Sequence, residues 1–344
     1  MSSPAVIYTD AVLFDMDGTL TDSISAVEAA WGKVAKDIGQ DPEYVIAATH
    51  GKRAIDNLSQ FKPHLKDHEI EREVERFEET ILYYADAHHM HSAANTPRTE
   101  FLSADYTPAD SSETTPALTP GSSAPISRRS SLMSESRRPS FGARLFNMLN
   151  IASRLRIYED DSVPEAGEHA IDVGPQEMDA DKKLTGDLLE AWQIEAASVD
   201  RSVRILPGVR RMLDSLPAGR YAVATSGAKT YAYGCMKRVG IVPPPVTITA
   251  DDKRLKAGKP APDPFLLAAE CLGYDAKKCI VFEDSPSGIR AGVASGATVI
   301  AVCTSHERSK IENCGAHYIV EDMNAITPEV MEDGSLKFTI NLTA

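Results

Sequence analysis

Short apolar runs alternate with longer amphipathic stretches over most of the chain. Each run has the length of a buried strand, and the stretches between them have the spacing of helices. The runs lie at residues 10–15, 220–225, 246–249, 279–282, 297–302 and 317–320. Alternating strands and helices build a parallel sheet with helices on both faces, so the pattern predicts an α/β fold.

The region after the first run has a helical pattern. Ser23 precedes an amphipathic helix, and apolar residues continue at helical spacing, with breaks, to about residue 91. Helical patterns return at residues 188–200 and after Gly208, before the alternation begins.

The composition changes between these two regions. Of the 38 residues 103–140, 20 are Ser, Thr or Pro, and such a segment cannot bury enough apolar surface to offset the entropy of ordering it. Residues 158–187 carry ten acidic and two basic side chains. We therefore expect residues 93–187 to form a largely disordered insert, first Ser/Thr/Pro-rich and then acidic.

The net charge and the cysteines argue against several classes of protein. The 344 residues carry a formal net charge of −14, which disfavours wrapping a nucleic acid. The five cysteines include no CxxC pair, so a disulfide framework and a zinc site are poor interpretations. Neither a signal peptide nor a membrane-spanning run is apparent, and we expect a cytoplasmic protein.

Two carboxylates follow the first predicted strand, in the sequence DMDGT at residues 15–19. Ligands of open parallel sheets bind at the carboxyl ends of the strands. Asp15 and Asp17 would repel each other without a cation, and oxygen ligands with no Cys or His nearby favour a divalent ion. A calcium loop shares the DxDG pattern, but here its ligand at position 12 is missing and a buried strand precedes it.

Polar residues also end two later strands. Thr225 and Ser226 follow one of them, where they can hold phosphate oxygens or cap the next helix. Glu283 and Asp284 follow another, and metal ligation would supply the partner that buried acids need. Lys259 lies between them in a proline-rich loop, although a lone lysine is usually solvated.

The order of these motifs resembles the haloacid-dehalogenase-like phosphatase superfamily, in which DxDGT is followed by Thr, Lys and Glu-Asp at strand ends. The resemblance covers residues 10–92 and 188–325. It implies a Rossmann-like core with a small α-helical cap. The core would comprise residues 1–21 and 205–344, and the cap residues 22–92 and 188–204.

The resemblance also implies a mechanism. Asp15 would attack phosphorus and form an aspartyl-phosphate, while Asp17 would act as general acid and then as general base. Phosphoryl transfer needs mainly positioning and charge neutralisation, which such residues provide.

The remaining motif residues would bind phosphate and metal. Thr225, Ser226 and Lys259 would neutralise the phosphoryl oxygens. Mg²⁺ would be bound by the first carboxylate of the DxD motif, the carbonyl of the second and Asp284, with Glu283 supporting from close by.

The cap carries a closer resemblance. DPE at 41–43, THGKR at 49–53 and FKP at 61–63 resemble the fungal glycerol-3-phosphate and 2-deoxyglucose-6-phosphate phosphatases. The cap loop of such enzymes faces the active site, so His50, Lys52 and Arg53 would read the substrate. A solvated basic loop is the alternative interpretation.

The resemblance therefore implies a phosphatase for a small phosphorylated metabolite, of the polyol or sugar phosphate kind. A sugar phosphomutase of the same superfamily would return the phosphoryl group to its substrate instead. The alternative from another class is a non-catalytic regulator that acts through the insert, although every catalytic position is filled. The sequence lacks the P-loop GxxxxGK[ST], which disfavours a kinase.

Two other segments allow further hypotheses. Ser131 and Ser140 each lie two residues after an arginine pair, a spacing typical of kinase targets, and an apolar stripe at 141–155 could dock on a partner. A neutral tether is the alternative for the insert. DAHHMH at 86–91 is either a metal site or a solvated histidine cluster.

Overall fold

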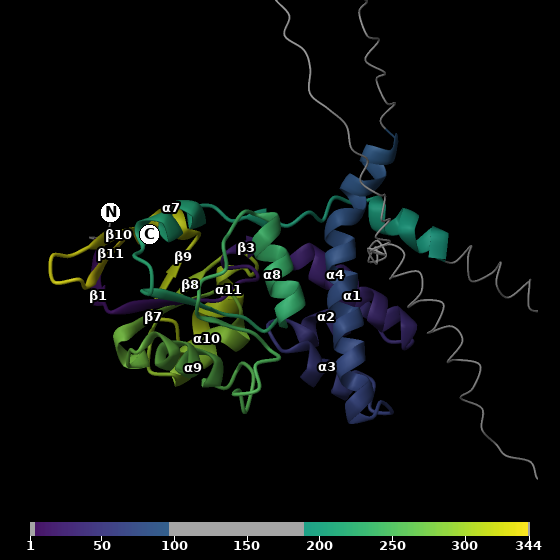
Figure 1. The fold of residues 1–344 in the computed structure, drawn as a ribbon, viewed down its shortest axis with the longest axis horizontal. Helices are drawn as coiled ribbons and strands as arrows, with labels where there is room; N and C mark the ends of the chain where they lie inside the picture. The colour runs from purple at the N-terminus through teal and green to yellow at the C-terminus, as the bar shows by residue number, and fades with distance from the viewer. Residues whose placement is uncertain (1–3, 96–188, 343–344) are drawn as a thin grey trace, which may run out of the picture. The chain divides into compact units, whose positions relative to one another are not determined.

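The computed structural model describes residues 4–95 and 189–342. Residues Met1–Asn95 and Gln193–Ala344 belong to one compact unit. This unit holds the central sheet, the helices around it and the helical cap (Figure 1).

Six parallel strands form the central sheet, in the order β6-β5-β2-β7-β8-β9. In that order they are Thr247–Ile248, Tyr221–Ala224, Ala11–Phe14, Cys279–Glu283, Thr298–Val302 and Tyr318–Val320. Each coincides with a predicted apolar run, which confirms the α/β fold. All four residues of β2 are buried, because a central parallel strand is covered on both faces.

Helices between the central strands complete the core. They are α7 (Val209–Ser215), α8 (Lys229–Arg238), α9 (Asp263–Leu272), α10 (Pro286–Ala294) and α11 (Arg308–Ile311). Short 3₁₀ helices occupy Ala276–Lys278, Glu312–Cys314 and Met323–Ala325. Buried side chains of α9 and α10, among them Phe265 and Ile289, form one apolar cluster with side chains of β2, β5, β7 and β8.

A second sheet is antiparallel, in the order β1-β11-β10, and the sequence interpretation did not include it. Its strands are Ala5–Thr9, Leu336–Ile340 and Ile326–Val330. Phe338 of β11 contacts Phe282 of β7, with ring centroids 6.2 Å apart. Buried and partly exposed residues alternate along β11, and a search for continuous apolar runs overlooks that pattern.

The cap contains the helices α1 (Ile24–Asp37), α2 (Pro42–Thr49), α3 (Ala54–Phe61) and α4 (Asp67–Asn95). Trp31 of α1 packs on Phe77 of α4, with ring centroids 4.2 Å apart. Two short strands, β3 (Thr21–Asp22) and β4 (Arg204–Ile205), pair where the chain leaves and re-enters the core. A further helix, at residues 189–197, agrees with the helical pattern predicted there.

The predicted insert falls almost entirely outside the described residues. Ser131, Ser140 and the apolar stripe at 141–155 lie there too, so the hypotheses about them stay predictions. Between residues 4–95 and 189–342, no helix combines the length and the apolar character needed to cross a membrane.

Candidate active site

The candidate site lies where three adjacent strands end. β5, β2 and β7 are neighbours in the parallel sheet, so the residues that follow them emerge at one edge. Asp15 follows β2, Thr225 follows β5, and Asp284 follows β7. The loop before α9 brings Lys259 to the same place, where it contacts Asp15 and Glu283.

Lys259 is a buried cation between two carboxylates. Only 3% of its surface is exposed. Its Nζ donates to an oxygen of Asp15 and, at 2.8 Å, to Oε1 of Glu283. Burial acts to lower the pKa of Lys259, but the charges of Asp15 and Glu283 outweigh it and raise that pKa. The side chain therefore stays protonated at neutral pH.

The buried acids outnumber this cation. Asp15, Glu283 and Asp284 are 6%, 1% and 1% exposed. Burial raises the pKa of Asp15 to about 7, and it also raises the pKa values of Asp17 and Asp284. The site thus disfavours the ionised form of these carboxylates.

A divalent cation would relieve this imbalance. Asp15, Glu283 and Asp284 each offer a ligand atom, and these atoms lie within 4.8 Å of one another. Carboxylate oxygens are the ligands that Mg²⁺ and Ca²⁺ prefer, and a bound cation would favour the ionised acids. The residues present therefore fit a hard divalent metal ion.

Both carboxylate oxygens of Glu283 accept hydrogen bonds. Its Oε2 accepts hydrogen bonds from the backbone N–H groups of Asp284 and Ser285, both at 2.8 Å, and from Ser285 Oγ at 3.1 Å. Its Oε1 accepts from Lys259. Glu283 therefore orients the lysine and the following loop, which leaves Asp15 and Asp284 better suited to bind a metal directly.

Three hydroxyl groups hold the carboxylate of Asp17. Ser23 Oγ and Tyr231 Oη each donate to its Oδ1 at 2.5 Å, and Thr225 Oγ1 donates to its Oδ2 at 3.4 Å. Burial raises the pKa of Asp17 more than these hydrogen bonds lower it. Ser23, which precedes α1, makes no side-chain cap hydrogen bond to that helix, and its hydroxyl serves Asp17 instead.

Sequence reasoning missed Glu78, a buried residue of the cap helix α4. The carboxylate accepts from the backbone N–H groups of Ala228, at 2.5 Å, and Tyr231, at 3.3 Å. Glu78 thus caps the N-terminus of the core helix α8, whose Tyr231 in turn contacts Asp17. No local signal could have identified it, because Glu78 stands in the charged stretch EREVERFEET and its partner Ala228 lies 150 residues away.

The same face of α4 makes two further contacts with α8. A Cβ added to Gly234 would lie 3.0 Å from a methyl carbon of Leu82, so the two helices approach closely. Asp86 forms an ion pair with Arg238. Positions four residues apart share one face of a helix. The side chains of Glu78, Leu82 and Asp86 therefore lie along one face of α4, and all three contact α8.

The cap loop after α2 lies on the core. Ser226 Oγ donates to the Gly51 carbonyl oxygen at 3.1 Å. Gly51 has a φ of +71°, and a Cβ there would lie 2.7 Å from Ser285 Oγ. Both the backbone conformation and the close approach therefore require glycine at this position.

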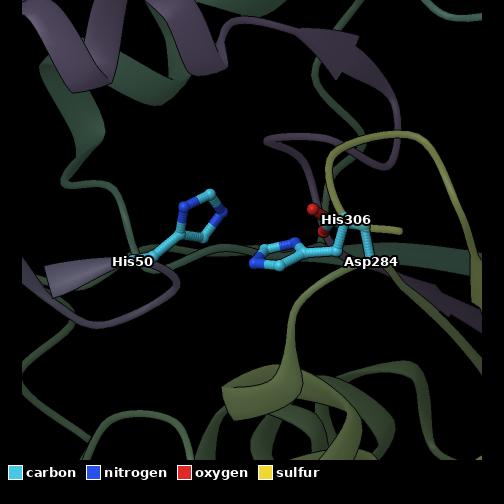
Figure 2. A group of neighbouring side chains, drawn as sticks. All are labelled: His50, Asp284 and His306. Carbon is cyan, nitrogen blue, oxygen red and sulfur yellow. The ribbon is translucent and has the colours of Figure 1, made fainter. Parts of the chain in front are cut away.

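His50 precedes Gly51 in the chain, and its imidazole ring contacts that of His306 in the core. The rings of His50 and His306 are edge to face, with centroids 4.4 Å apart, and Figure 2 shows Asp284 beside them. Burial lowers the pKa of His50 to about 4 and also lowers the pKa of His306. Both imidazoles are therefore neutral at pH 7 and can form hydrogen bonds without adding charge.

His50, Asp284 and His306 also offer ligand atoms within 4.8 Å of one another, as a second group of possible metal ligands. Within the part of the chain that the structure describes, the 86–91 histidine stretch forms no such group.

The two basic residues of the predicted cap set differ in position. Lys52 is exposed and lines the cavity between cap and core, where its Nζ donates to the Ala48 carbonyl oxygen at 2.8 Å. Arg53 pairs with Asp56, its Nε 2.8 Å from Oδ2, and its side chain occupies the space beside Gly258. Arg53 is not among the described residues that line the cavity.

This cavity lies between the cap and the carboxyl end of the sheet. It is partly open to solvent. Its polar lining from the core includes Asp15, Asp17, Ser226, Lys259 and Glu283. Its apolar lining comes from the cap and includes Ile24, Val27, Trp31, Ile46, Phe77 and Ile81.

The sequence model of the haloacid dehalogenase-like hydrolases matches residues 9–296. This match spans well over half of the chain, and the chain belongs to the haloacid dehalogenase-like hydrolase family. The family resemblance drawn from the motif order is therefore confirmed, and the prediction of an enzyme with it.

Three relatives illustrate the similarity. Glycerol-1-phosphate phosphohydrolase 2 of Saccharomyces cerevisiae is 32% identical over 205 residues, 54% of this chain and 80% of the relative. Hexitol phosphatase A of Escherichia coli is 27% identical over 84% of this chain and 81% of its own. 2-Deoxyglucose-6-phosphate phosphatase 2 of Saccharomyces cerevisiae is 23% identical over 96% of this chain and 95% of its own.

We predict that Gly288→Ala destabilises the site. Gly288 lies in α10, and a Cβ there would overlap the Glu283 carboxylate, which would have to move away from Lys259. Overpacking together with a broken buried ion pair should lower the free energy of unfolding by about 3 kcal/mol or more. Thermal unfolding measures the loss. The control is Gly32→Ala in α1, where the nearest atom is 4.0 Å from the added Cβ, and equal stability of the two variants would contradict the prediction.

Glu78 should make the stability of the fold depend on pH. Burial raises the pKa of Glu78 to about 7 from 4.5, so between these values the unfolded chain loses this proton and the folded chain keeps it. The contribution of Glu78 to the free energy of unfolding therefore falls by roughly 3 kcal/mol as pH rises through this window. The melting temperature of the wild type minus that of Glu78→Gln should decrease from about pH 5 to about pH 7.5, across that window.

Glu75→Gln is the control for this measurement, because Glu75 is an exposed residue of the same helix. The melting temperature of the wild type minus that of Glu75→Gln should not change with pH. If the melting temperature of the wild type minus that of Glu78→Gln instead grows with pH, the N–H groups of α8 hold the pKa of this carboxyl below its usual value.

Proposed function

We propose that this hydrolase is a Mg²⁺-dependent phosphatase that acts on the monophosphate ester of a small polyol or sugar. The observation that carries the proposal is the arrangement around Asp15. Its carboxylate contacts the buried Lys259, shares a group of possible metal ligands with Asp284, and faces a cavity that Asp17 also lines. A nucleophile, a proton donor and charge neutralisation are what phosphoryl transfer requires.

In the first step, an oxygen of Asp15 attacks phosphorus and forms an acyl phosphate while the bond from phosphorus to the leaving oxygen breaks. Asp17 gives its proton to that oxygen, and the alcohol departs. The raised pKa of Asp17 is consistent with this role, because a general acid needs its proton near neutral pH.

In the second step, Asp17 accepts a proton from water as the water oxygen attacks phosphorus. The bond from phosphorus to Asp15 breaks, which releases inorganic phosphate and restores the carboxylate. Lys259 and Thr225 would neutralise phosphoryl oxygens, and Ser226 would stay with the cap loop. Asp15, Asp284 and the backbone carbonyl of Asp17 would hold Mg²⁺, which would supply further positive charge to neutralise the phosphoryl group.

The relatives and the cavity support the substrate class. The names of the three relatives refer to glycerol 1-phosphate, a hexitol and 2-deoxyglucose 6-phosphate, and each of these compounds is a small hydroxylated molecule or its phosphate ester. The cavity in this chain combines a polar lining from the motifs, which includes Asp15, Asp17 and Lys259, with an apolar lining from the cap.

The test is a panel of phosphate esters with Mg²⁺, in which free phosphate and isomerised sugar phosphate are both measured. Glycerol 1-phosphate, sorbitol 6-phosphate and 2-deoxyglucose 6-phosphate are ranked by kcat/KM. We expect release of phosphate. Isomer formation without phosphate release would identify a phosphomutase instead.

We predict that Asp15→Asn abolishes turnover, because an amide cannot attack phosphorus. Asp17→Asn should lower kcat by about 10²–10⁴-fold, the usual worth of a general acid and base. Thermal unfolding checks that both variants fold, and removing the Asp15 charge from this crowded cluster should not lower the melting temperature. Phosphate release at the wild-type rate by either folded variant would disprove the mechanism.

We also predict that activity needs Mg²⁺ and is lost in EDTA. Asp284→Asn should raise the Mg²⁺ concentration for half-maximal activity more than it raises KM for the ester, because Asp284 would ligate the metal directly. Asp214→Asn, at an exposed position of α7, is the control and should leave both values unchanged. An unaltered Mg²⁺ requirement in Asp284→Asn would remove this residue from the metal site.

A further inference from the structure

Glu28 of α1 is a charged residue of the cavity lining, and neither residues 4–95 nor residues 189–342 offer it a hydrogen bond or an ion pair. The other charged groups of the lining are engaged. Asp15, Asp17, Glu283 and Lys259 hydrogen-bond as described, Glu78 caps α8, and Lys52 donates to Ala48.

The surroundings of Glu28 make this lack of a partner costly. The residue is half-buried, and its neighbours in the cavity lining include the apolar Val27 and Trp31. Burial raises its pKa, because the ionised carboxylate is partly desolvated where it stands. A hydrogen-bond donor supplied by a ligand would recover that loss, whereas an anionic ligand group would add to it.

A second charged group limits which donor fits. Lys52 lines the same cavity, so a cationic ligand group would meet an ammonium as well as a carboxylate. A hydroxyl group suits either residue, because it can donate to the Glu28 carboxylate or accept from the Lys52 ammonium. The lining therefore favours a ligand that is neutral and hydroxylated at the end away from its phosphate.

We propose that Glu28 is a specificity residue, which accepts hydrogen bonds from hydroxyl groups of the leaving alcohol and excludes leaving groups with a second anionic group. The proposal rests on the proposed function, since it assigns the cap side of the cavity to the part of the ester that departs. It narrows the substrate class to polyhydroxylated monophosphates without a carboxylate or a second phosphate.

Three phosphate esters with the same three-carbon skeleton test this proposal. Glycerol 3-phosphate carries a central and a terminal hydroxyl group. In 3-phosphoglycerate a carboxylate replaces the terminal carbon and its hydroxyl group, and n-propyl phosphate lacks both hydroxyl groups. The wild type should prefer glycerol 3-phosphate to each of the others by about 10- to 100-fold in kcat/KM, the worth of a hydrogen bond to a charged group.

Two variants separate hydrogen bonding from charge. Glu28→Leu should bring the ratio of glycerol 3-phosphate to n-propyl phosphate close to one, because the acceptor is gone. Glu28→Gln keeps an acceptor oxygen without the charge, so it should lose most of the discrimination against 3-phosphoglycerate and keep part of the preference for hydroxyl groups. Glu71→Gln, at an exposed position of α4, is the control and should show the wild-type ratios.

The outcomes distinguish this proposal from the proposed function. Unchanged ratios in both Glu28 variants, with an active wild type, would overturn the role of Glu28 and leave the phosphatase intact. A wild type that hydrolyses none of the three esters, nor any ester of the wider panel, would overturn the proposed function and this proposal with it.

Discussion

The structure depends on the burial of several carboxylates at one edge of the central sheet, where Lys259 is the cation that the described residues place among them. Asp15, Glu283 and Asp284 are each almost fully buried, and an unpaired buried charge is costly. Lys259 neutralises part of the charge, backbone N–H groups bind Glu283, and hydroxyl groups donate to Asp17 and Asp284. Within the described ranges Asp284 has hydroxyl donors but no ion pair, and this is the physical argument for a divalent metal ion.

The same constraint connects the cap to the chemistry. Asp17 is held by Tyr231, which lies in the first turn of α8, and the N-terminus of α8 is capped by Glu78 from α4. A helix N-terminus carries partial positive charge and unsatisfied N–H groups, so the helix that Glu78 caps offsets part of the cost of burying its carboxylate. One consequence is that the cap cannot leave α8 without exposing those N–H groups and freeing the helix that positions the proposed general acid.

Most of the core could be predicted from the sequence, because its signals are local. Continuous apolar runs mark strands buried on both faces, and the candidate site residues Asp15, Thr225 and Asp284 follow those strands directly. The missing parts depend on tertiary contacts. β11 is buried on one face only. The partner of Glu78, Ala228, lies 150 residues away in the sequence, so the spacing of the charged residues around Glu78 could not reveal that it caps another helix.

The distribution of charge around the cavity separates the reaction from the choice of substrate. The neutral imidazoles of His50 and His306 add no charge where cap and core meet, so the buried positive charge stays concentrated at Lys259 and the proposed metal ion, where the phosphoryl group would bind. The cap contributes apolar side chains, the carboxylate of Glu28 and the exposed Lys52. A phosphoryl group is bound through its charge, which every phosphate ester shares. Discrimination must therefore come from the leaving group, and the cap residues that reach it can change without disturbing the carboxylates that the core has to keep.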